Sequence, residues 1–299
     1  MCRWLAYYGS PILLEELLYK PEHSLIDQSR HARMGVETLN GDGVGVGWFP
    51  EPAPQALKFP SPEPPPGADG AVTPALFRST GPAWGDMNLK DLAGHVRSPL
   101  FFAHIRASTG TPVQQTNCHP FRRGRWLWMH NGAISGFHEL KRDLLLAVDP
   151  TLMPDIQGST DSELMFYLAL TFGLEDDPRT AVARMICHVE ATAEKHGVAN
   201  PLQMTVATSD GERMWAFRYS TEGRSRSLFF STAPETLGRM YPDIPVLSVL
   251  PPDTRVIVSE PLGDLKGAWN AVPESTCGIV QPGEDELMSM EPFLAAARR

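Results

Sequence analysis

The alternation of strand-like and helix-like segments constrains the fold of this 299-residue chain more than any other feature. Two runs of short apolar segments with strand character lie on either side of helical patterns in the middle of the chain. The expected strands are 3–8, 100–105, 125–130, 203–208, 212–219, 227–231, 245–249 and 254–259. The expected helices are 12–19, 136–147, 161–173 and 179–196. Strand runs that bracket central helices predict an α+β protein in which helices cover stacked antiparallel sheets.

Cap and turn residues support two of these boundaries. Ser159-Thr160-Asp161, followed by Glu163, places N-cap chemistry at the start of the helix expected over 161–173. Asp210-Gly211 separates two expected strands and is typical of a hairpin turn. The strand pair in the C-terminal third is therefore expected to be antiparallel.

A proline-rich segment, 50–74, interrupts the pattern and contains Pro64-Pro65-Pro66. Proline breaks helices and cannot donate to a strand ladder, so most of this segment cannot form a helix or a central strand. We interpret it as a surface excursion within a domain. The sequence predicts one domain over 1–280 and a helical C-terminal tail over 281–299, with acidic residues early and two arginines last.

Composition excludes several classes of protein. The net charge of −9 argues against non-specific nucleic-acid binding, which depends on neutralising phosphates. No stretch approaches the ~20 apolar residues that a membrane span needs. The N-terminus lacks the basic and then apolar pattern of a secretory signal. We therefore expect a cytoplasmic protein with neither a nucleic-acid nor a membrane partner.

The four cysteines do not form a metal or redox motif. Cys2, Cys118, Cys187 and Cys277 are far apart, with no C-x-x-C spacing, which argues against a zinc ribbon or a thioredoxin-like site. Without a secretion signal, disulfides are not expected either. Cys118 is interpreted as structural, and Cys187, in an apolar helical pattern, as a core residue.

Two other patterns resemble cofactor motifs only superficially. The alternating glycines of 41–47 do not fit G-x-G-x-x-G and run toward a strand, which argues against a dinucleotide site. His188-Val-Glu190 has the H-x-E spacing of zinc deaminases, but no P-C-x-x-C follows it. We therefore expect no metal and no cofactor.

A cysteine at position two offers distinctive chemistry. Its small side chain makes removal of Met1 expected, which would leave Cys2 as the N-terminal residue. An α-amino group with a pKa of about 7.7–8.0 would then belong to the same residue as a thiol with a pKa of about 8.5. The amine can accept the thiol proton directly or through a water, so nucleophile and base coincide. For an isolated Met-Cys start, the alternative is a buried cysteine at a strand edge.

Four further segments contain residues that suit cleavage of a γ-glutamyl amide. A glutamyl head group needs a cation for its carboxylate and an anion for its ammonium, and the reaction needs donors for a tetrahedral oxyanion. Taken singly, each segment also has an ordinary explanation, such as a surface ion pair, a turn or an acidic helix start. The segments are HIRASTG (104–110), NCHPF (117–121), HNGAI (130–134) and GSTDSE (158–163).

Specific side chains in these segments match those needs. Arg106 suits a carboxylate because its planar guanidinium can hold two oxygens at once. Asp161 suits an ammonium group. The side-chain amide of Asn131 beside the backbone N–H of Gly132 is a donor pair suited to an oxyanion.

Cys2 and these four segments, in this order, resemble the class II glutamine amidotransferases, which are N-terminal nucleophile hydrolases. The resemblance covers roughly the first 170 residues by motif, and five motifs together are highly specific. It implies a four-layer αββα sandwich. It assigns the functional residues as follows: Cys2 as nucleophile, Asn131 and Gly132 as oxyanion hole, Arg106, Thr109 and His119 around the glutamyl carboxylate, and Asp161 at the α-ammonium.

Within that family the chain is more similar to free-standing members than to synthase-type members. The latter carry a large ammonia-consuming domain, whereas the residues after Asp161 here have the pattern of further strands of the same sandwich. The start MCRWLAYYG and the segment GDGVGVGWF resemble the free-standing group, which includes γ-glutamyl hydrolases of ergothioneine synthesis and of glutathione-type peptide breakdown. This resemblance implies that water completes the reaction. Ala107 stands where synthase-linked members often have tryptophan, which leaves the shape of that pocket wall open.

Two other functions remain open at this point. The chain could supply ammonia as the glutaminase subunit of a separate synthase, or work with a separate hydrolase subunit. It could also be a non-catalytic sensor of glutamine or a γ-glutamyl metabolite on the same fold. Retention of Met1 would favour the sensor, because the blocked amine of Cys2 could not act as base. In each case the expected ligand is a small γ-glutamyl molecule.

Overall fold

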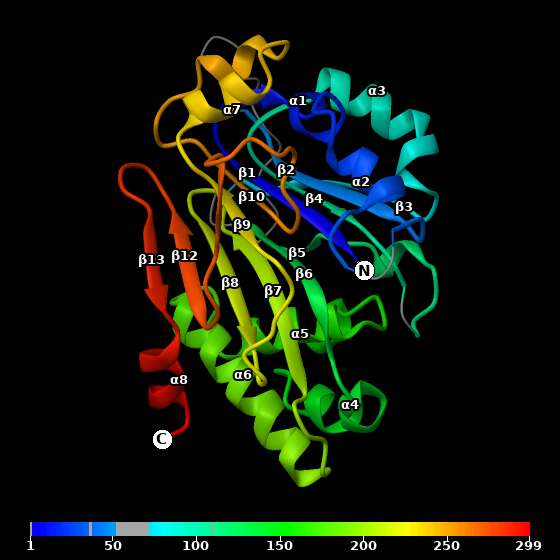
Figure 1. Ribbon diagram of the computed structural model, residues 1–299. Coiled ribbons are helices and arrows are strands. Elements are labelled where there is room, and N and C mark those ends of the chain that lie inside the picture. Colours follow the sequence, from blue (N-terminus) through cyan, green and yellow to red (C-terminus); the bar gives the residue numbers. More distant parts are fainter. Residues whose placement is uncertain (1, 36–37, 52–71, 109) are drawn as a thin grey trace, which may run out of the picture.

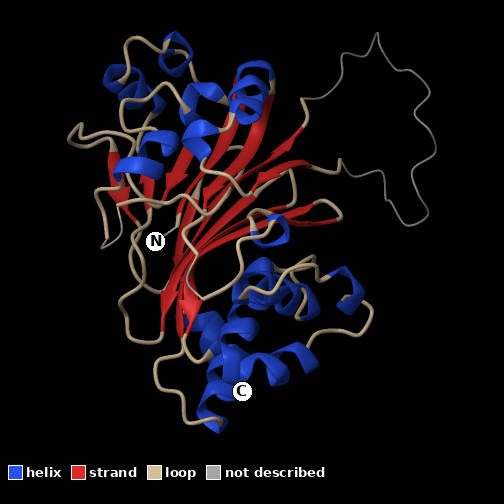
Figure 2. Cartoon of the chain, turned by 90° about the vertical axis from the view of Figure 1, so that its right-hand side faces the viewer, coloured by secondary structure: helices blue, strands red, loops and turns tan. Residues whose placement is uncertain are grey.

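Two antiparallel sheets packed face to face form the centre of the computed structural model, which describes residues 2–35, 38–51, 72–108 and 110–299 (Figures 1 and 2). Within these residues the first sheet has the order β11-β9-β10-β1-β4-β2-β3 and the second the order β13-β12-β8-β7-β6-β5. The strands are β1 Arg3–Leu13, β2 Val44–Phe49, β3 Ala75–Ser79, β4 Arg97–Ile105, β5 Phe121–Arg123, β6 Trp126–Ile134, β7 Leu202–Ser209, β8 Met214–Ser220, β9 Phe229–Ser231, β10 Arg255–Val258, β11 Trp269–Ala271, β12 Thr276–Val280 and β13 Glu286–Ser289.

Helices cover the outer face of each sheet, as Figure 2 shows. The first sheet is covered by α1 Glu15–Leu18, α2 Leu25–His31, α3 Met87–His95 and α7 Pro234–Met240. The second is covered by α4 Phe137–Leu146, α5 Asp161–Thr171, α6 Pro178–Lys195 and α8 Glu291–Ala297. None of the helices in the described ranges is long and apolar enough to cross a membrane.

Three apolar cores separate the four layers. One lies between the two sheets, where Trp4 and Phe102 of the first sheet meet Met129 and Ala207 of the second. The other two lie between each sheet and its own helices. Apolar side chains therefore point to both faces of β1 and β6, which makes these strands central and rigid supports for residues at their ends.

Most expected elements are confirmed, with three corrections. The helical tail expected over 281–299 is wrong in its first half, because Glu286–Ser289 pairs with β12 as strand β13 and only Glu291–Ala297 is helical. The helix expected over 12–19 is wrong in its first half, because β1 continues to Leu13, which pairs with Arg97 of β4. Tertiary strand pairing here outweighs the local leucine pattern. The strand expected over 245–249 is also wrong, and a 3₁₀ helix spans Pro245–Ser248. Pro245 has no N–H for a strand ladder, and its fixed φ suits the first turn of a helix.

The C-terminal segment that the sequence sets apart adjoins the sandwich. Within 281–299, β13 pairs with β12, and α8 packs on α6 with Leu294 buried. The proline-rich segment 50–74 lies between β2 and β3, which pair with each other. Its residues 52–71 lie outside the described part of the chain.

Candidate active site

Cys2 lies immediately before β1, a central strand of the first sheet. Arg3 pairs with Ile105 of the antiparallel strand β4, so Cys2 lies level with Arg106. The Cys2 thiol points to the backbone carbonyl of Ala107, with 3.6 Å between Sγ and O. Burial raises the pKa of this thiol, while the charge of Arg106 lowers it and that of Asp161 raises it again. A thiol with a raised pKa needs a base beside it in order to act as a nucleophile.

The Arg106 guanidinium is buried at the end of β4, and one of its nitrogen atoms makes no hydrogen bond within the described residues. Its Nη2 donates to Ser108 Oγ at 3.2 Å and to Thr111 Oγ1 at 2.7 Å. Its Nη1 is buried and has no hydrogen-bond partner among the described residues. A buried, oriented cation with a free donor is suited to bind a carboxylate.

Asp161 is the first residue of α5 and links this helix to the end of β6. Its Oδ2 accepts from the backbone N–H of Ile134 at 2.9 Å. Its Oδ1 accepts from the backbone N–H of Ser162 at 2.7 Å and lies 3.2 Å from the Ser162 hydroxyl. Thr160 caps the helix by accepting from Glu163 N, as the cap pattern predicts. The carboxylate therefore has a fixed orientation, and its negative charge raises the pKa of the Cys2 thiol.

Sequence reasoning missed two residues that support Asp161. His130 is buried on β6, and its Nδ1 lies 2.8 Å from Ser162 Oγ. Ser162 thus connects the imidazole to the Asp161 carboxylate. Both residues lie inside the motifs around Asn131 and Asp161, but the motifs alone do not show that they are in contact.

Asn131 and Gly132 lie on β6, opposite the strand that carries Cys2. Thr205 Oγ1 of β7 accepts from Trp4 Nε1 at 3.2 Å and donates to Asn131 O at 3.3 Å. This pair of hydrogen bonds links β1 to β6 across the sandwich. Gly132 has a φ of +155°, and a Cβ at this position would lie 1.8 Å from Gln203 O. No other residue fits there without moving β7.

Asn131 also lines a cavity of about 210 Å³. The cavity is also lined by Arg3, by Met34 and Gly35, and by the loop 225–227. The cavity therefore adjoins both Arg3, the residue after Cys2, and the expected oxyanion donor.

His119 is buried next to a second buried histidine. Its ring stacks on His104, with 4.1 Å between the ring centroids, and also packs against Phe121. Burial and the neighbouring His104 lower the pKa of His119 well below its ordinary value, so the ring is neutral. Neither ring nitrogen has a hydrogen-bond partner within the described ranges. A direct role for His119 with substrate stays a prediction, and Thr109 lies outside the described residues.

The site geometry agrees with a family match over most of the chain. The model for "Glutamine amidotransferases class-II" matches residues 24–292. The chain belongs to the class II glutamine amidotransferases. The resemblance inferred from five short motifs is confirmed, and with it the assignment of the chain as an enzyme of the glutamine amidotransferase and γ-glutamyl hydrolase type.

Two curated relatives align with most of this amidotransferase. It is 35% identical over 302 aligned positions to "Probable glutamine amidotransferase DUG3" of Saccharomyces cerevisiae, covering 92% of this chain and 80% of that protein. It is 25% identical over 279 positions to "Gamma-glutamyl-hercynylcysteine sulfoxide hydrolase" of Mycolicibacterium smegmatis, covering 92% and 93% of the two chains.

Solved structures confirm the fold. A glutamine aminotransferase class-II domain protein from Silicibacter pomeroyi superposes with a TM-score of 0.67 and 29% identity, covering 97% of this chain and 99% of that one. The glutamine phosphoribosylpyrophosphate amidotransferase of B. subtilis superposes with a TM-score of 0.60 and 15% identity. The superposition covers 97% of this chain and 49% of that one. The amidotransferase is an αββα sandwich of the N-terminal nucleophile hydrolase type.

The glycines at 41–47 have a packing explanation in this amidotransferase. They lead into and along β2, against which the segment 118–120 lies. A Cβ on Gly45 would lie 2.0 Å from His119 O. Glycine there allows the backbone of the NCHPF motif to approach the sheet closely, which a longer side chain would prevent.

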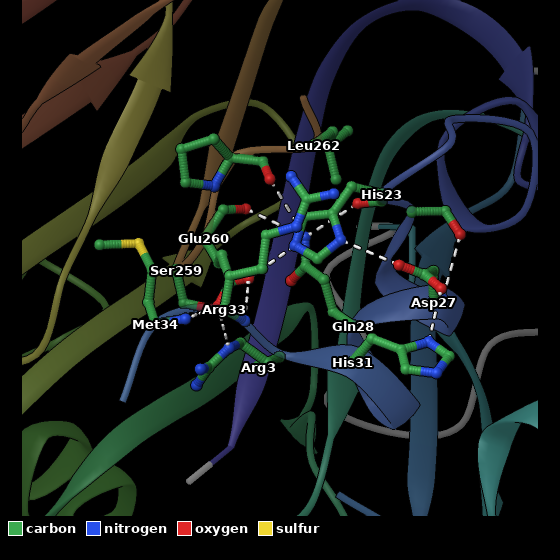
Figure 3. A network of polar contacts seen from close by, with 12 residues as sticks. Arg3, His23, Asp27, Gln28, His31, Arg33, Met34, Ser259, Glu260 and Leu262 are labelled. Carbon is green, nitrogen blue, oxygen red and sulfur yellow. Dashed lines mark hydrogen bonds and ion pairs between the residues drawn. The ribbon is translucent and has the colours of Figure 1, made fainter. Parts of the chain in front are cut away.

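A buried polar network adjoins the start of β1 and was not expected from the sequence (Figure 3). At its centre is Glu260, which follows β10 and is 2% exposed. Its carboxylate accepts from Arg3 Nε at 2.8 Å and is 2.6 Å from His23 Nε2. It also accepts from the backbone N–H groups of Arg33 and Met34, at 2.8 and 2.9 Å. All four acceptor positions of the carboxylate are thus in use.

The network predicts a specific acid dependence of stability. Burial alone would raise the pKa of Glu260, but hydrogen bonds from His23 and the backbone, with the charge of Arg3, lower it to about 2. A lowered pKa in the folded state stabilises the protein above the ordinary pKa of the group, and this contribution is lost as pH falls toward 2. Between pH 4.5 and 2, the urea midpoint of the wild type should fall more steeply than that of Glu260→Gln. If the urea midpoints of the two proteins fall in parallel with pH, the pKa of Glu260 is not lowered by folding in this way.

Proposed function

We propose that this amidotransferase hydrolyses a γ-glutamyl amide through a thioester on Cys2, with water as the final acceptor. The observation that carries the proposal is the surroundings of the Cys2 thiol. It lies level with buried Arg106 in the sheet, and the charges of both Arg106 and Asp161 reach it. One cation and one anion beside a nucleophile match the carboxylate and ammonium of a glutamyl group.

The first half of the reaction forms the thioester. After removal of Met1, the α-amino group of Cys2 takes the thiol proton, and Sγ attacks the γ-carbonyl carbon of the substrate. The resulting oxyanion is stabilised by the side-chain amide of Asn131 and the backbone N–H of Gly132. The C–N bond then breaks, and the leaving amine takes a proton from the α-ammonium of Cys2.

The second half releases glutamate. The α-amino group, now neutral, removes a proton from water, and the hydroxide oxygen attacks the thioester carbonyl. The same donors stabilise the second oxyanion, and the C–S bond breaks to regenerate the thiol. The names of the two curated relatives, a glutamine amidotransferase and a γ-glutamyl compound hydrolase, support a γ-glutamyl substrate.

Competition between hydroxylamine and water tests this proposal. Glutamine and a γ-glutamyl dipeptide are each hydrolysed in the presence of hydroxylamine, and glutamate and γ-glutamyl hydroxamate are measured. A common thioester gives the same ratio of the two products from both substrates, because the leaving group has gone before the ratio is set. A ratio that depends on the leaving group would contradict the thioester. Hydrolysis that appears only after a partner protein is added would instead indicate a subunit of a synthase or hydrolase.

The proposed roles of Asp161 and Arg106 can be tested by comparing the binding of L-glutamate with the binding of analogues that lack its ammonium or its α-carboxylate. Asp161→Asn should weaken L-glutamate binding roughly 10- to 100-fold, because a charged hydrogen-bond partner of the ammonium is lost. It should leave the binding of glutarate, which has no ammonium, nearly unchanged. Arg106→Gln should show the reverse pattern, with a loss for glutamate and little change for 4-aminobutanoate, which has no α-carboxylate. The dissociation constants are measured by calorimetry.

The opposite ligand selectivity expected of the two variants distinguishes a loss of ligand recognition from a loss of folding. A variant that is simply less well folded would bind all three ligands more weakly. Equal losses for glutamate and for the truncated ligand would therefore remove the assigned role of that residue.

A further inference from the structure

The first residues of the mature chain need an anchor that the sheet does not provide. Cys2 precedes β1, and the strand pairing begins only at Arg3. Once Met1 is removed, no peptide bond precedes Cys2, and its backbone can rotate more freely. A residue that serves as both nucleophile and base must hold its thiol and its amine in one orientation toward the substrate.

Arg3 supplies a contact that restricts this rotation. Its Nη1 donates to the carbonyl oxygen of Cys2 at 3.0 Å, while its Nε donates to Glu260 Oε2 at 2.8 Å. The guanidinium is 3% exposed and the Glu260 side chain 2%. Arg3 thus connects the nucleophile residue to a carboxylate that lies 257 positions away in the sequence.

The same carboxylate also holds the backbone of a residue that lines the cavity beside Asn131. Glu260 accepts from the N–H groups of Arg33 and Met34, and Met34 lines that cavity together with Arg3. In Figure 3 the side chains of Arg3 and His23 and the 33–34 backbone converge on Glu260 from separate segments. One buried group therefore fixes two structures that border the reaction centre.

Stability alone does not account for such a group. Removing two charges from water is costly, and buried ion pairs contribute little to folding compared with apolar residues of similar volume. Their best-supported use is to specify one arrangement of the groups that they hold.

We propose that Glu260 is a positioning residue of this enzyme, which orients the Cys2 nucleophile through Arg3 and fixes the backbone of Met34, a residue that lines the cavity beside Asn131. This inference rests on the proposed function, because it concerns the same reaction centre. Glu260 does not contact the reacting atoms. Its effect reaches Cys2 through the hydrogen bond from Arg3 to the Cys2 carbonyl.

Steady-state kinetics of Glu260→Gln with L-glutamine test this inference. Glutamine at this position keeps the side-chain length but is neutral and turns one of the two acceptor oxygens into a donor, so Arg3 loses the negative charge of its ion-pair partner. We expect kcat to fall roughly 10- to 100-fold with KM changed much less, because orientation of the nucleophile matters most in the transition state. The matched control is Glu190→Gln. Glu190 accepts from Tyr219 and Arg298 on the outer side of the second sheet, and its variant should keep wild-type kcat.

A double variant tests the route through Arg3. If Glu260 acts on catalysis through Arg3, then Arg3→Met combined with Glu260→Gln should have a kcat within about threefold of the lower single variant. Losses that multiply would show that Glu260 acts independently, and a Glu260→Gln variant with wild-type kcat would also overturn the inference. If Glu260→Gln does not fold, Arg3→Lys replaces it, because Glu260 then keeps His23 and its two backbone donors. Wild-type kcat in Arg3→Lys would overturn the inference equally.

The assay also separates this inference from the proposed function. A wild-type protein that neither hydrolyses γ-glutamyl amides nor reacts with a glutamine-shaped electrophile would contradict both. An active wild type with an unaffected Glu260→Gln variant would contradict the positioning role alone.

Discussion

Replacing Cys2 with alanine is expected to lower amide hydrolysis by at least about 10⁴-fold, because nucleophile and covalent intermediate are both lost. The measurement is kcat/KM for L-glutamine, with glutamate as the detected product. Alanine is also small, so removal of Met1 is expected to continue in the variant. The melting temperature should change little, since Cys2 is only partly buried and lies before the first strand.

Cys187→Ala is the matched control for this experiment. Its thiol is also partly buried, but it lies on α6 and contacts Leu294 O of α8 at 3.8 Å. This variant should keep wild-type kcat/KM. Substantial hydrolysis by Cys2→Ala, with glutamate as product, would show that another group or a bound water attacks the amide.

Gly132→Ala is expected to cost more than about 3 kcal/mol of unfolding free energy and to abolish hydrolysis. Its Cβ would lie 1.8 Å from Gln203 O, a backbone atom of β7, at a φ of +155°. Either β6 and β7 separate or the backbone of Gly132 rotates. Both outcomes move the N–H that is proposed to stabilise the oxyanion. Urea denaturation and kcat/KM are measured on the same preparation.

Gly278→Ala provides the comparison within a strand of the same sheet. A Cβ on Gly278, in β12, would find its nearest heavy atoms at 3.8 Å, which is ordinary van der Waals contact. This variant should change the unfolding free energy by less than about 1 kcal/mol and leave hydrolysis intact. A Gly132→Ala variant as stable and as active as Gly278→Ala would contradict the described strand pairing at Gly132.

The order of elements could be predicted from local patterns, whereas their contacts could not. The helices α4, α5 and α6 were expected close to their observed bounds, and α5 begins at the cap expected from Thr160, which acts within one turn. Asn131-Gly132 has the sequence of a turn, yet both residues pair with β7 in the middle of a sheet. Pairing with residues more than 70 positions away outweighed the local preference.

The site shows the same division between motif and contact. Cys2, Arg106 and Asp161 could be chosen from the sequence because each carries the chemical group that a glutamyl amide requires. Glu260 could not, because its partners Arg3 and His23 lie 257 and 237 positions away and no motif surrounds it. Ser162 and His130 lie within motifs, but only the packing of α5 on β6 brings them together.

Intact-mass spectrometry before and after exposure to 6-diazo-5-oxo-norleucine is the decisive test of a processed N-terminal nucleophile. We expect a mature protein without Met1 that gains one adduct, which peptide mapping places on Cys2, and no adduct in the Cys2→Ala variant. A protein that retains Met1 and gains no adduct would contradict a processed N-terminal nucleophile, and it would favour a sensor of γ-glutamyl ligands on the same fold.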